Sequence, residues 1–437
     1  MLQKLIHRGI FLAMVLSTAL TACNRSVTTL DSVTLTTTSV TSTTRTSTAP
    51  TSTTPTLPHL ILIAASDSSN QWKSQATVVC SGKSDQLVIN KYLVTGHIIE
   101  LASGTFNCDG TINLQANIHM YGQGDTTIFN CIGGGIYLHN IDNVELDHFK
   151  ISGAINLGII PASLYIDATT NDHSGFSIHD IKESAKGGFL IHTSGHKITN
   201  VVFANCDSSQ PDGMGFFMDG DGIGSLFQDF IFYDCTVENA GTADTRYNDW
   251  VTGFDFAEGD NNLTVNRLCV IQCSVNGSWE SDFHFEAAPR ETGIVILDCN
   301  ATNAGQKTSP TYGYGYLLPS RSDSEYIFQG NTGRNNAGSG DVYDAQDPYL
   351  HNLPYDIVYG SFKEVSRISQ GNCEGLIVTF GTYKDLYLYS NNSYKVNQQI
   401  ELGANYVPND GKTYTFTDTK IVAQFTGYAV IRLTKLE

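Results

Sequence analysis

Short runs in which apolar residues alternate with other residues recur through the middle of the chain. The clearest are triplets with an apolar residue at each end: Ile136–Leu138, Leu164–Ile166, Phe189–Ile191, Phe216–Met218, Phe254–Phe256, Phe283–Phe285 and Tyr314–Tyr316. They begin roughly 25–31 residues apart, with one longer interval, which is a usual length for one repeat of a solenoid. Because successive side chains of a strand point to opposite faces, we expect the outer residues of each triplet inside the protein and the middle residue outside.

A second set of apolar runs falls between these triplets. It comprises Asn200–Phe203, Phe230–Phe232, Cys269–Ile271 and Ile294–Ile296. Two strands per repeat predict parallel sheets that stack rung on rung around one core, a rung being one repeat of the solenoid. Four cysteines recur at similar places in the repeats, Cys206, Cys235, Cys273 and Cys299. We expect them to form an interior column of small apolar side chains rather than a disulfide framework.

The first rungs are predicted between Ile98 and Thr127. Apolar residues alternate there at Ile99, Leu101, Ile112, Leu114, Ile118 and Met120, with turns expected at Gly104–Phe106 and Gly122–Gly124. We interpret the Gly-x-Gly sequence as a turn and not as a phosphate-binding loop, because no helical pattern follows it. This stretch resembles the opening rungs of pectate-lyase-like β-helix proteins.

The resemblance extends over roughly residues 60–345. It implies an all-β protein with a right-handed parallel β-helix of the pectate-lyase-like type, a fold found in many exported surface proteins of bacteria and archaea. Such a solenoid needs a cover over its first rung. Ser84 or Asp85 is expected to begin a short amphipathic helix that runs to about Leu93 and forms this N-terminal cap.

The amino-acid composition divides the chain into segments of different predicted character. A basic start and a short apolar stretch precede Leu20-Thr21-Ala22-Cys23, which is typical of a lipobox. We expect a lipoprotein signal peptide in residues 1–22, lipidation of Cys23, a disordered Thr- and Ser-rich linker in 23–58, the β-helix in 59–345 and a small β-rich cap or accessory domain in 346–437. Strands of this last part are expected at Tyr414–Thr417, Ile421–Phe425 and Tyr428–Leu433. These features predict an exported protein that a lipid anchors to the membrane at the cell surface.

The excess of acidic over basic residues limits which molecules the protein is expected to bind. The 437 residues include 43 acidic and 25 basic side chains, which give a net charge of −18. A nucleic-acid partner is not expected, because phosphate binding needs a basic surface. An anionic polysaccharide would be repelled unless a metal ion or a local group of Arg and Lys intervenes. Of ten cysteines, an odd number remains once Cys23 is set aside, so they cannot all pair within the chain.

Stacking the triplets in register predicts two outward columns of side chains. The first contains Tyr137, Tyr165, Leu190, Phe217, Asp255, His284 and Gly315, and the second contains His139, Asp167, His192, Asp219, Ala257, Glu286 and Leu317. The aromatic residues Tyr137, Tyr165 and Phe217 offer flat platforms for sugar rings. The predicted catalytic acid–base groups are Asp219, Asp255, His284 and Glu286. Asp219 and Asp221 are the predicted ligands of a calcium ion, the cofactor considered for this site.

Two segments are expected to rise beside this face. One is Ala240–Thr252, before the Asp255 strand, and the other is Gln306–Tyr312. They carry Arg246, Tyr247, Trp250, Lys307 and Tyr312, which we predict to contact a polysaccharide. A solvated ladder of purely structural polar pairs would give the same columns, so this interpretation stays open as well.

Two functions therefore remain open. The first is polysaccharide cleavage, by a hydrolase with two carboxylates such as Asp255 and Glu286, or by a lyase with His284, Arg246 or Lys307 as the base. The second is a non-catalytic glycan-binding, adhesive or structural role in the cell envelope. The chain lacks the Gly-His-Gly and Arg-x-Lys sequences of polygalacturonase-like hydrolases. Copper-delivery proteins share the fold, but the chain has only five Met residues and no His-rich tract.

Overall fold

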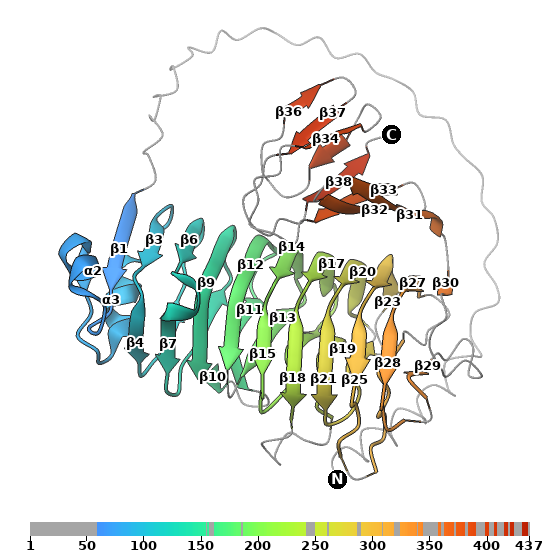
Figure 1. Ribbon diagram of the computed structural model, residues 1–437, viewed down its shortest axis with the longest axis horizontal. Coiled ribbons are helices and arrows are strands. Elements are labelled where there is room, and N and C mark those ends of the chain that lie inside the picture. Colours follow the sequence, from blue (N-terminus) through green and yellow to red (C-terminus); the bar gives the residue numbers. More distant parts are fainter. Residues whose placement is uncertain are drawn as a thin grey trace, which may run out of the picture. The chain divides into compact units, whose positions relative to one another are not determined.

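The computed structural model describes residues 59–343 except 154, 157–160, 185–186, 242–249, 260–261, 286–289, 308, 319–323 and 339, together with strands between residues 357 and 435. Residues 59–343 form a parallel β-helix with three sheets, which we call the first, second and third sheets. Figure 1 shows their strands side by side along the solenoid, in the order of the sequence. The predicted fold class is confirmed.

The strands of the three sheets follow one another in every rung. The first sheet contains β1 (Leu60–Ala64), β3 (Ile98–Leu101), β6 (Ile118–Tyr121), β9 (Val144–Gly153), β12 (His173–Ser184), β14 (Lys197–Ala204), β17 (Leu226–Tyr233), β20 (Thr264–Ile271), β24 (Ile294–Leu297) and β27 (Tyr326–Gln329). The second contains β4 (Gly104–Cys108), β7 (Thr127–Cys131), the later halves of β9 and β12, β15 (Asp207–Ser209), β18 (Thr236–Ala240), β21 (Ser274–Ser278), β25 (Asn300–Thr302) and β28 (Thr332–Arg334). The third contains β5 (Ile112–Asn113), β8 (Ile136–His139), β11 (Pro161–Ala168), β13 (Gly188–Ser194), β16 (Phe216–Asp221), β19 (Phe254–Gly259), β22 (Phe283–Phe285), β26 (Tyr316–Leu317) and β29 (Val342–Tyr343). The short strands β2 (Val78–Val79) and β23 (Arg290–Thr292) pair in parallel with β1 and β20, and β10 (Ile155–Asn156) pairs antiparallel with β11.

A single residue in the left-handed backbone conformation marks the corner between the first and second sheets. In successive rungs this position is held by His148, Asp180, Asn205, Asp234, Gln272 and Asp298, whose φ angles lie between 50° and 58°. Asn and Asp adopt this conformation more readily than most residues, because their short polar side chains bond locally. Asn205 Nδ2 donates to Asp180 Oδ1 over 2.5 Å and so connects two successive corners. The corner explains why these polar residues recur at one place in the repeat.

The core follows the predicted triplets. Their outer residues are buried except for Tyr314 in the last triplet. Rings stack along the solenoid axis at centroid separations of 4.6 Å for Phe216–Phe254, 5.1 Å for Phe254–Phe283 and 5.0 Å for Phe283–Tyr316. The four recurring cysteines each follow a left-handed corner residue, and all four are buried and free. The predicted interior cysteine column is therefore confirmed.

The predicted N-terminal helix is present as α3 (Asp85–Tyr92). Its Ile89 and the following Leu93 join the core, and the Asp85 carboxylate accepts hydrogen bonds from the backbone N–H groups of Gly82 and Asn107. A second short helix, α2 (Asn70–Gln75), was not predicted; the Ser69 side chain accepts a bond from its first turn. No helix among the described residues is long and apolar enough to cross a membrane.

The structure corrects the sequence-based predictions at three places, one in the type of element and two in the register. Gly104–Phe106 is not a turn but the start of strand β4. In the last triplet, Tyr316 pairs with Phe283 and Leu317 with His284, so Leu317 and not Gly315 continues the first outward column. A bulge between β16 and β19 places Asp219 opposite Glu258 instead of Ala257. A bulge adds one residue to one strand, which a count of residues along the sequence does not reveal.

Strands after β29 pair differently from those of the solenoid. The antiparallel partner of β27 is β30 (Ile357–Tyr359). One antiparallel sheet has the order β31 (Phe362–Gln370), β32 (Cys373–Phe380), β33 (Tyr383–Tyr389), β38 (Ile431–Lys435) and β35 (Tyr406–Pro408), and another has the order β34 (Gln398–Glu401), β37 (Lys420–Ala423) and β36 (Thr415–Thr417). The three strands predicted in this part are thus present. Its role as a cap or accessory domain stays a prediction, and the signal peptide, Cys23 and the linker lie outside the described residues.

Candidate functional site

The first predicted outward column exists on the third sheet. Pairing in register joins Tyr137, Tyr165, Leu190, Phe217, Asp255 and His284 across β8, β11, β13, β16, β19 and β22. Each is the middle residue of its triplet, as the alternation predicted. The structure therefore aligns aromatic residues at one end of this face and ionisable residues at the other.

The aromatic end is more enclosed than predicted. The rings of Tyr137 and Tyr165 stack with centroids 5.0 Å apart, but Tyr165 is only 8% exposed and Phe217 only 5%. Both pack in one apolar cluster with Leu190 and Met214. The prediction that Tyr165 and Phe217 form open platforms is therefore wrong, because neighbouring side chains cover them. Tyr137 is partly exposed, and its hydroxyl donates to the Asp167 carboxylate over 2.5 Å.

The ionisable end brings the predicted pair together. His284 Nδ1 lies 3.7 Å from Asp255 Oδ2, and the Thr252 hydroxyl donates to the same oxygen over 3.3 Å. Although both side chains point away from the core, Asp255 is 2% exposed and His284 8%. The Tyr312 ring lies 6.0 Å from the His284 ring, and the Trp250 ring lies 6.1 Å from that of Tyr312. The two predicted segments thus do reach this pair.

Lys307 forms an ion pair, and its predicted contact with a polysaccharide stays a prediction. Its Nζ donates to Glu280 Oε1 over 3.2 Å, and the Tyr312 backbone N–H donates to Glu280 Oε2 over 2.8 Å. Glu280 is buried, so this ion pair holds the segment before Tyr312 against the solenoid. Lys307 is therefore a structural partner of Glu280, and the segment positions Tyr312 beside His284.

The remaining predicted residues are separate from this pair or not described. Asp219 Oδ2 lies 3.1 Å from His192 Nδ1 on the neighbouring rung, and Asp221 is exposed at the end of β16. Their calcium site stays a prediction. Arg246, Tyr247 and Glu286 lie outside the described residues.

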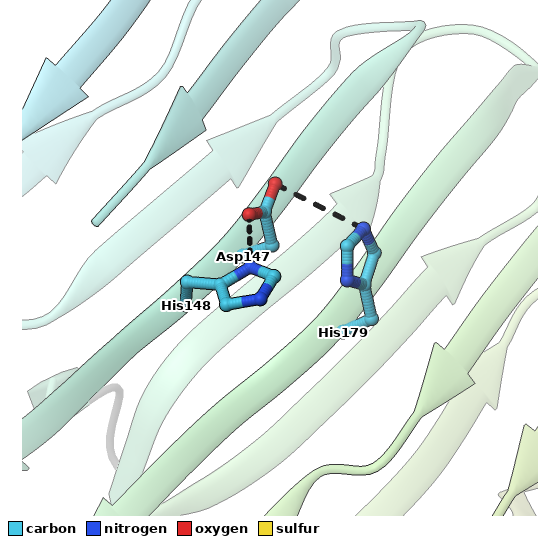
Figure 2. A group of neighbouring side chains, drawn as sticks. All are labelled: Asp147, His148 and His179. Carbon is cyan, nitrogen blue, oxygen red and sulfur yellow. Dashed lines mark hydrogen bonds and ion pairs between the residues drawn. The ribbon is translucent and has the colours of Figure 1, made fainter. Parts of the chain in front are cut away.

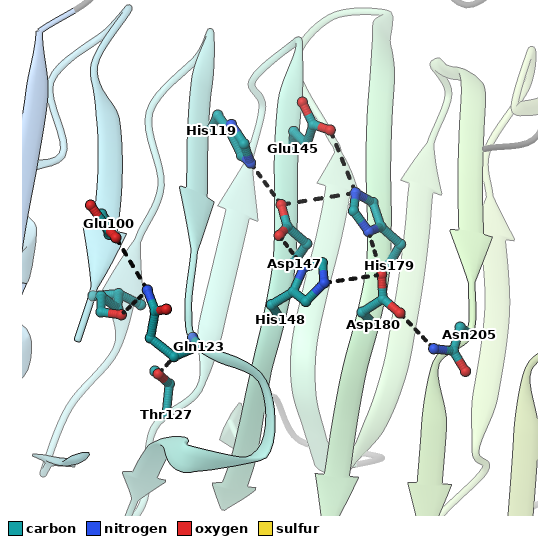
Figure 3. Close-up of polar contacts among 11 residues, drawn as sticks. Glu100, His119, Gln123, Thr127, Glu145, Asp147, His148, His179, Asp180 and Asn205 are labelled. Atoms are coloured by element: carbon teal, nitrogen blue, oxygen red, sulfur yellow. Dashed lines mark hydrogen bonds and ion pairs between the residues drawn. The ribbon is translucent and has the colours of Figure 1, made fainter. Parts of the chain in front are cut away.

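A second group of ionisable side chains, which was not predicted from the sequence, lies on the outward face of the first sheet. Figure 3 shows it on β6, β9 and β12, and Figure 2 shows its members Asp147, His148 and His179. It contains three histidines and three carboxylates, namely His119, His148, His179, Glu145, Asp147 and Asp180. Two groups of three ligand atoms lie within 4.8 Å of one another, Asp147 with His148 and His179, and Asp147 with His119 and Glu145. Among the described residues, these are the groups with the spacing of metal ligands.

Asp147 is the centre of this histidine–carboxylate cluster. Its Oδ2 lies 2.6 Å from His119 Nε2 and 3.8 Å from His179 Nε2, and its Oδ1 lies 2.5 Å from His148 Nδ1. His179 Nε2 also lies 3.5 Å from Glu145 Oε1. On the opposite side of the same ring, Nδ1 lies 2.9 Å from Asp180 Oδ2. Asp180 therefore fixes the orientation of His179 and leaves its Nε2 directed at Glu145 and Asp147 (Figure 3).

Attraction between opposite charges shifts the pKa values of the carboxylates and histidines in the cluster. Burial opposes ionisation of Asp147, but hydrogen bonds with His119 and His148 lower its pKa to about 2. Burial likewise disfavours the charged form of His179, yet its bonds with Asp180 and Glu145 and the charge of Asp147 raise its pKa to about 10. The bond with Asp147 also raises the pKa of His148. Without a metal ion, His179 is a cation at neutral pH.

The sequence does contain a signal for this cluster. His119, Glu145 and His179 each follow a buried apolar residue in a strand, so each occupies an outward position. Outward columns were predicted only for the triplets of the third sheet. The same treatment of the first-sheet strands would have found these three residues and Asp147, which follows the buried Leu146, in neighbouring rungs.

Comparisons with known proteins found similarity among solved structures but not among family models or curated sequences. No family model matches this chain, and no curated protein sequence matches it. Among solved structures, pectate lyase Pel9A is 12% identical over 68% of this chain and 79% of its own, with a TM-score of 0.32. The A-module of mannuronan C-5 epimerase AlgE4 from Azotobacter vinelandii is 13% identical over 62% of this chain and 91% of its own, with a TM-score of 0.27. PfbA, a surface adhesin of Streptococcus pneumoniae, is 10% identical over 63% and 91%, with a TM-score of 0.21.

Proposed function

We propose that this protein binds a polysaccharide on the outward face of the third sheet, around Asp255 and His284. The observation that carries the proposal is that two ionisable side chains point away from the core and are nevertheless buried. Burying ionisable groups costs free energy, so a solvated ladder would leave them in water. Ionisable groups held in this way are concentrated at functional sites.

The surrounding side chains suit a sugar. Trp250 and Tyr312 come from two different segments and lie next to each other, and Tyr312 also lies beside His284. Aromatic rings present flat apolar surfaces with a polar edge, which match the faces and hydroxyl groups of a sugar ring. Asp255 and His284 would accept or donate hydrogen bonds to those hydroxyls. The Lys307–Glu280 ion pair would keep the Tyr312 segment in place.

The proximity of His284 and Asp255 favours a second candidate, which is cleavage of the bound glycan. A carboxylate within ion-pair distance of an imidazole orients the ring and stabilises its protonated form, as a general base requires. Glycosidases use two carboxyl groups that are roughly 5–9.5 Å apart. The described residues of this site supply one carboxylate and one imidazole beside each other, so they fit proton abstraction by a lyase better than hydrolysis.

A binding titration of the full chain against a panel of glycans tests the main proposal. Asp255→Asn, His284→Ala and Tyr312→Ala should abolish or strongly weaken binding, while His139→Ala, on the same sheet but away from the site, should not. A thermal melt of each variant separates this result from misfolding. If binding of all three variants equals that of the wild type, the site is elsewhere. If stability falls without any effect on ligand, Asp255 and His284 are a structural pair.

Products distinguish the two candidates. Absorbance of an unsaturated uronate would identify a lyase, new reducing ends without this absorbance a hydrolase, and binding without products a non-catalytic protein. His284→Ala should remove any product formed, because the imidazole is the proposed base.

We also propose that Cys23 carries the lipid that anchors the exported protein. The support is the lipobox-like sequence at Leu20–Cys23, followed by a stretch rich in Thr and Ser. Cys23→Ser should move the protein from the membrane fraction to the soluble fraction, or block its processing. Unchanged fractionation with detergent would contradict lipidation.

A further inference from the structure

We propose that the histidine–carboxylate cluster of the first sheet binds one Zn²⁺ ion through His119, Glu145, Asp147 and His179. This site is on a different sheet from Asp255 and His284, and it does not depend on the proposed glycan function. The four side chains are one imidazole from β6, two carboxylates from β9 and one imidazole from β12. Figure 3 shows their ends converging on one region of the surface.

Strand register brings these four residues together. His119 pairs with Glu145, and Asp147 pairs with His179, so the ligands occupy neighbouring positions on three successive rungs. All four occupy outward positions, because each directly follows a buried apolar residue of its strand, namely Ile118, Val144, Leu146 and Ile178. Rungs lie about 4.8 Å apart, which places side chains from adjacent rungs within reach of a common ion.

The distances suit a tetrahedral ion. Zinc binds His nitrogens and carboxylate oxygens at about 2.0–2.2 Å, which separates neighbouring ligand atoms in a tetrahedron by about 3.3–3.6 Å. His179 Nε2 lies 3.5 Å from Glu145 Oε1 and 3.8 Å from Asp147 Oδ2. His119 Nε2 and Asp147 Oδ2, now 2.6 Å apart, share a hydrogen bond that a metal would replace. His119 and Asp147 would therefore have to separate for the ion to enter, and His119 and His179, which belong to different groups of three, would have to approach each other.

The two imidazole nitrogens and two carboxylate oxygens favour one class of metal ion over another. Two imidazoles with two carboxylates form a donor set that zinc and similar transition metals accept. Calcium prefers six to eight oxygen ligands, so it fits this set poorly. Four protein ligands would close the coordination sphere, which is typical of structural zinc sites. An ion held in this way would connect three successive rungs.

Asp180 completes the site without contacting the ion. It holds His179 Nδ1 at 2.9 Å and so directs Nε2 towards the proposed metal position. Carboxylates that orient a ligating histidine typically contribute 10- to 100-fold to metal affinity. His148 occupies the exposed corner beside Asp147 and is a positioning residue in the same sense, since its Nδ1 holds Asp147 Oδ1 at 2.5 Å.

Calorimetric titration with Zn²⁺ tests the site, using the full chain freed of metal with EDTA and then of the chelator. We expect one Zn²⁺ per chain and a higher melting temperature with zinc than with EDTA. His119→Ala and His179→Ala should abolish both effects, and Glu145→Gln and Asp180→Asn should weaken binding roughly 10- to 100-fold with the fold intact. The matched control is His192→Ala, because His192 pairs with a single carboxylate, Asp219, on the third sheet. That variant should bind like the wild type.

Substitution by Co²⁺ identifies the ligands independently. Nitrogen and oxygen ligands in a tetrahedral site should give visible d–d bands without a thiolate charge-transfer band. The charge-transfer band would place the metal at cysteines and overturn the proposal. It would also be overturned by the absence of stoichiometric Zn²⁺ binding, by tighter binding of Ca²⁺ than of Zn²⁺, or by wild-type affinity in both His119→Ala and His179→Ala.

Discussion

The outward face of the first sheet has two halves that share one backbone geometry and differ in chemistry. On β3, β6, β9 and β12 the outward residues are polar or ionisable in most places, namely Glu100, His119, Tyr121, Glu145, Asp147, Ser177 and His179. On β14, β17, β20, β24 and β27 the same two columns continue as Val202, Ala204, Ile231, Tyr233, Cys269, Ile271, Val295, Leu297 and Ile327, and they end at the polar Gln329. The change occurs between two neighbouring strands, where His179 pairs with Ala204.

Burial differs between the two halves as sharply as polarity does. Ala204, Ile231, Tyr233, Cys269, Ile271, Val295, Leu297 and Ile327 are at most 2% exposed and form one apolar cluster. In the other half, His119, Glu145 and Ser177 are partly exposed. An outward position on a β-helix is therefore not the same as a solvated one. The polar half can hold ligands, whereas the apolar half contributes to stability by burial.

The largest effect is expected inside the solenoid, where the two halves do not differ. Phe285 is buried, and its ring stacks on that of Phe256 with centroids 4.7 Å apart. Phe285→Ala should lower the free energy of unfolding by roughly 3–5 kcal/mol, because it removes a large side chain and leaves a cavity. Denaturant titration measures this. A loss below about 1 kcal/mol would show that the inward assignment of the triplets is wrong.

One pair of substitutions compares the two halves directly. Ser177 and Ile231 belong to the same outward column, with only Val202 between them. Ile231→Ala should cost roughly 2–4 kcal/mol, because it removes buried methyl groups. Ser177→Ala should change stability by no more than about 0.5 kcal/mol. Equal effects in urea titrations would contradict the distinction between the halves.

The polar half should make stability depend on pH in metal-free protein. The folded pKa of His179, about 10, lies above its ordinary value of 6.5. Its contribution is therefore complete below about pH 6.5 and is lost as the pH rises through about 10. We expect a contribution of roughly 1.5–3 kcal/mol, which is typical of hydrogen bonds to charged groups. Urea titrations in EDTA at pH 6 and pH 10 should show a wild-type loss that His179→Gln lacks; parallel losses in both proteins would refute this.

A smaller effect of pH is expected at a corner beside the apolar half. Burial, followed by the proximity of Cys273 and Asp207, raises the pKa of Asp234 to about 6. Its neutral form therefore stabilises the fold at low pH, and this contribution is lost as the pH rises through about 6. Asp234→Asn keeps a residue that readily adopts the left-handed backbone conformation of this corner. The variant should be more stable than the wild type above pH 6 by about 0.5–1 kcal/mol, a figure that allows for screening by solvent. The difference should disappear near pH 4, which thermal melts at the two pH values would show.

The sequence by itself determined the repeating part of this protein. Alternation in the triplets and the spacing between them predicted the parallel β-helix, the inward rings such as Phe254 and Phe283, and the interior cysteines. These features are periodic, and a period in sequence becomes a stack in space whenever each rung rests on the one before. The pairing of Asp255 with His284 followed from the same register.

Only the tertiary structure decided what departs from that period or depends on more than one sheet. The bulge opposite Asp219 and the shift to Leu317 interrupt the count of residues, because one extra residue changes every later position in a rung. The burial of Tyr165, Asp255 and Ile231 depends on what covers an outward face, which alternation does not specify. The members of the histidine–carboxylate cluster extend in the sequence from His119 to Asp180, and three strands bring them into contact. Contact between such distant residues is set by the stacking of rungs, and it is this stacking that turns separate polar positions into a candidate metal site.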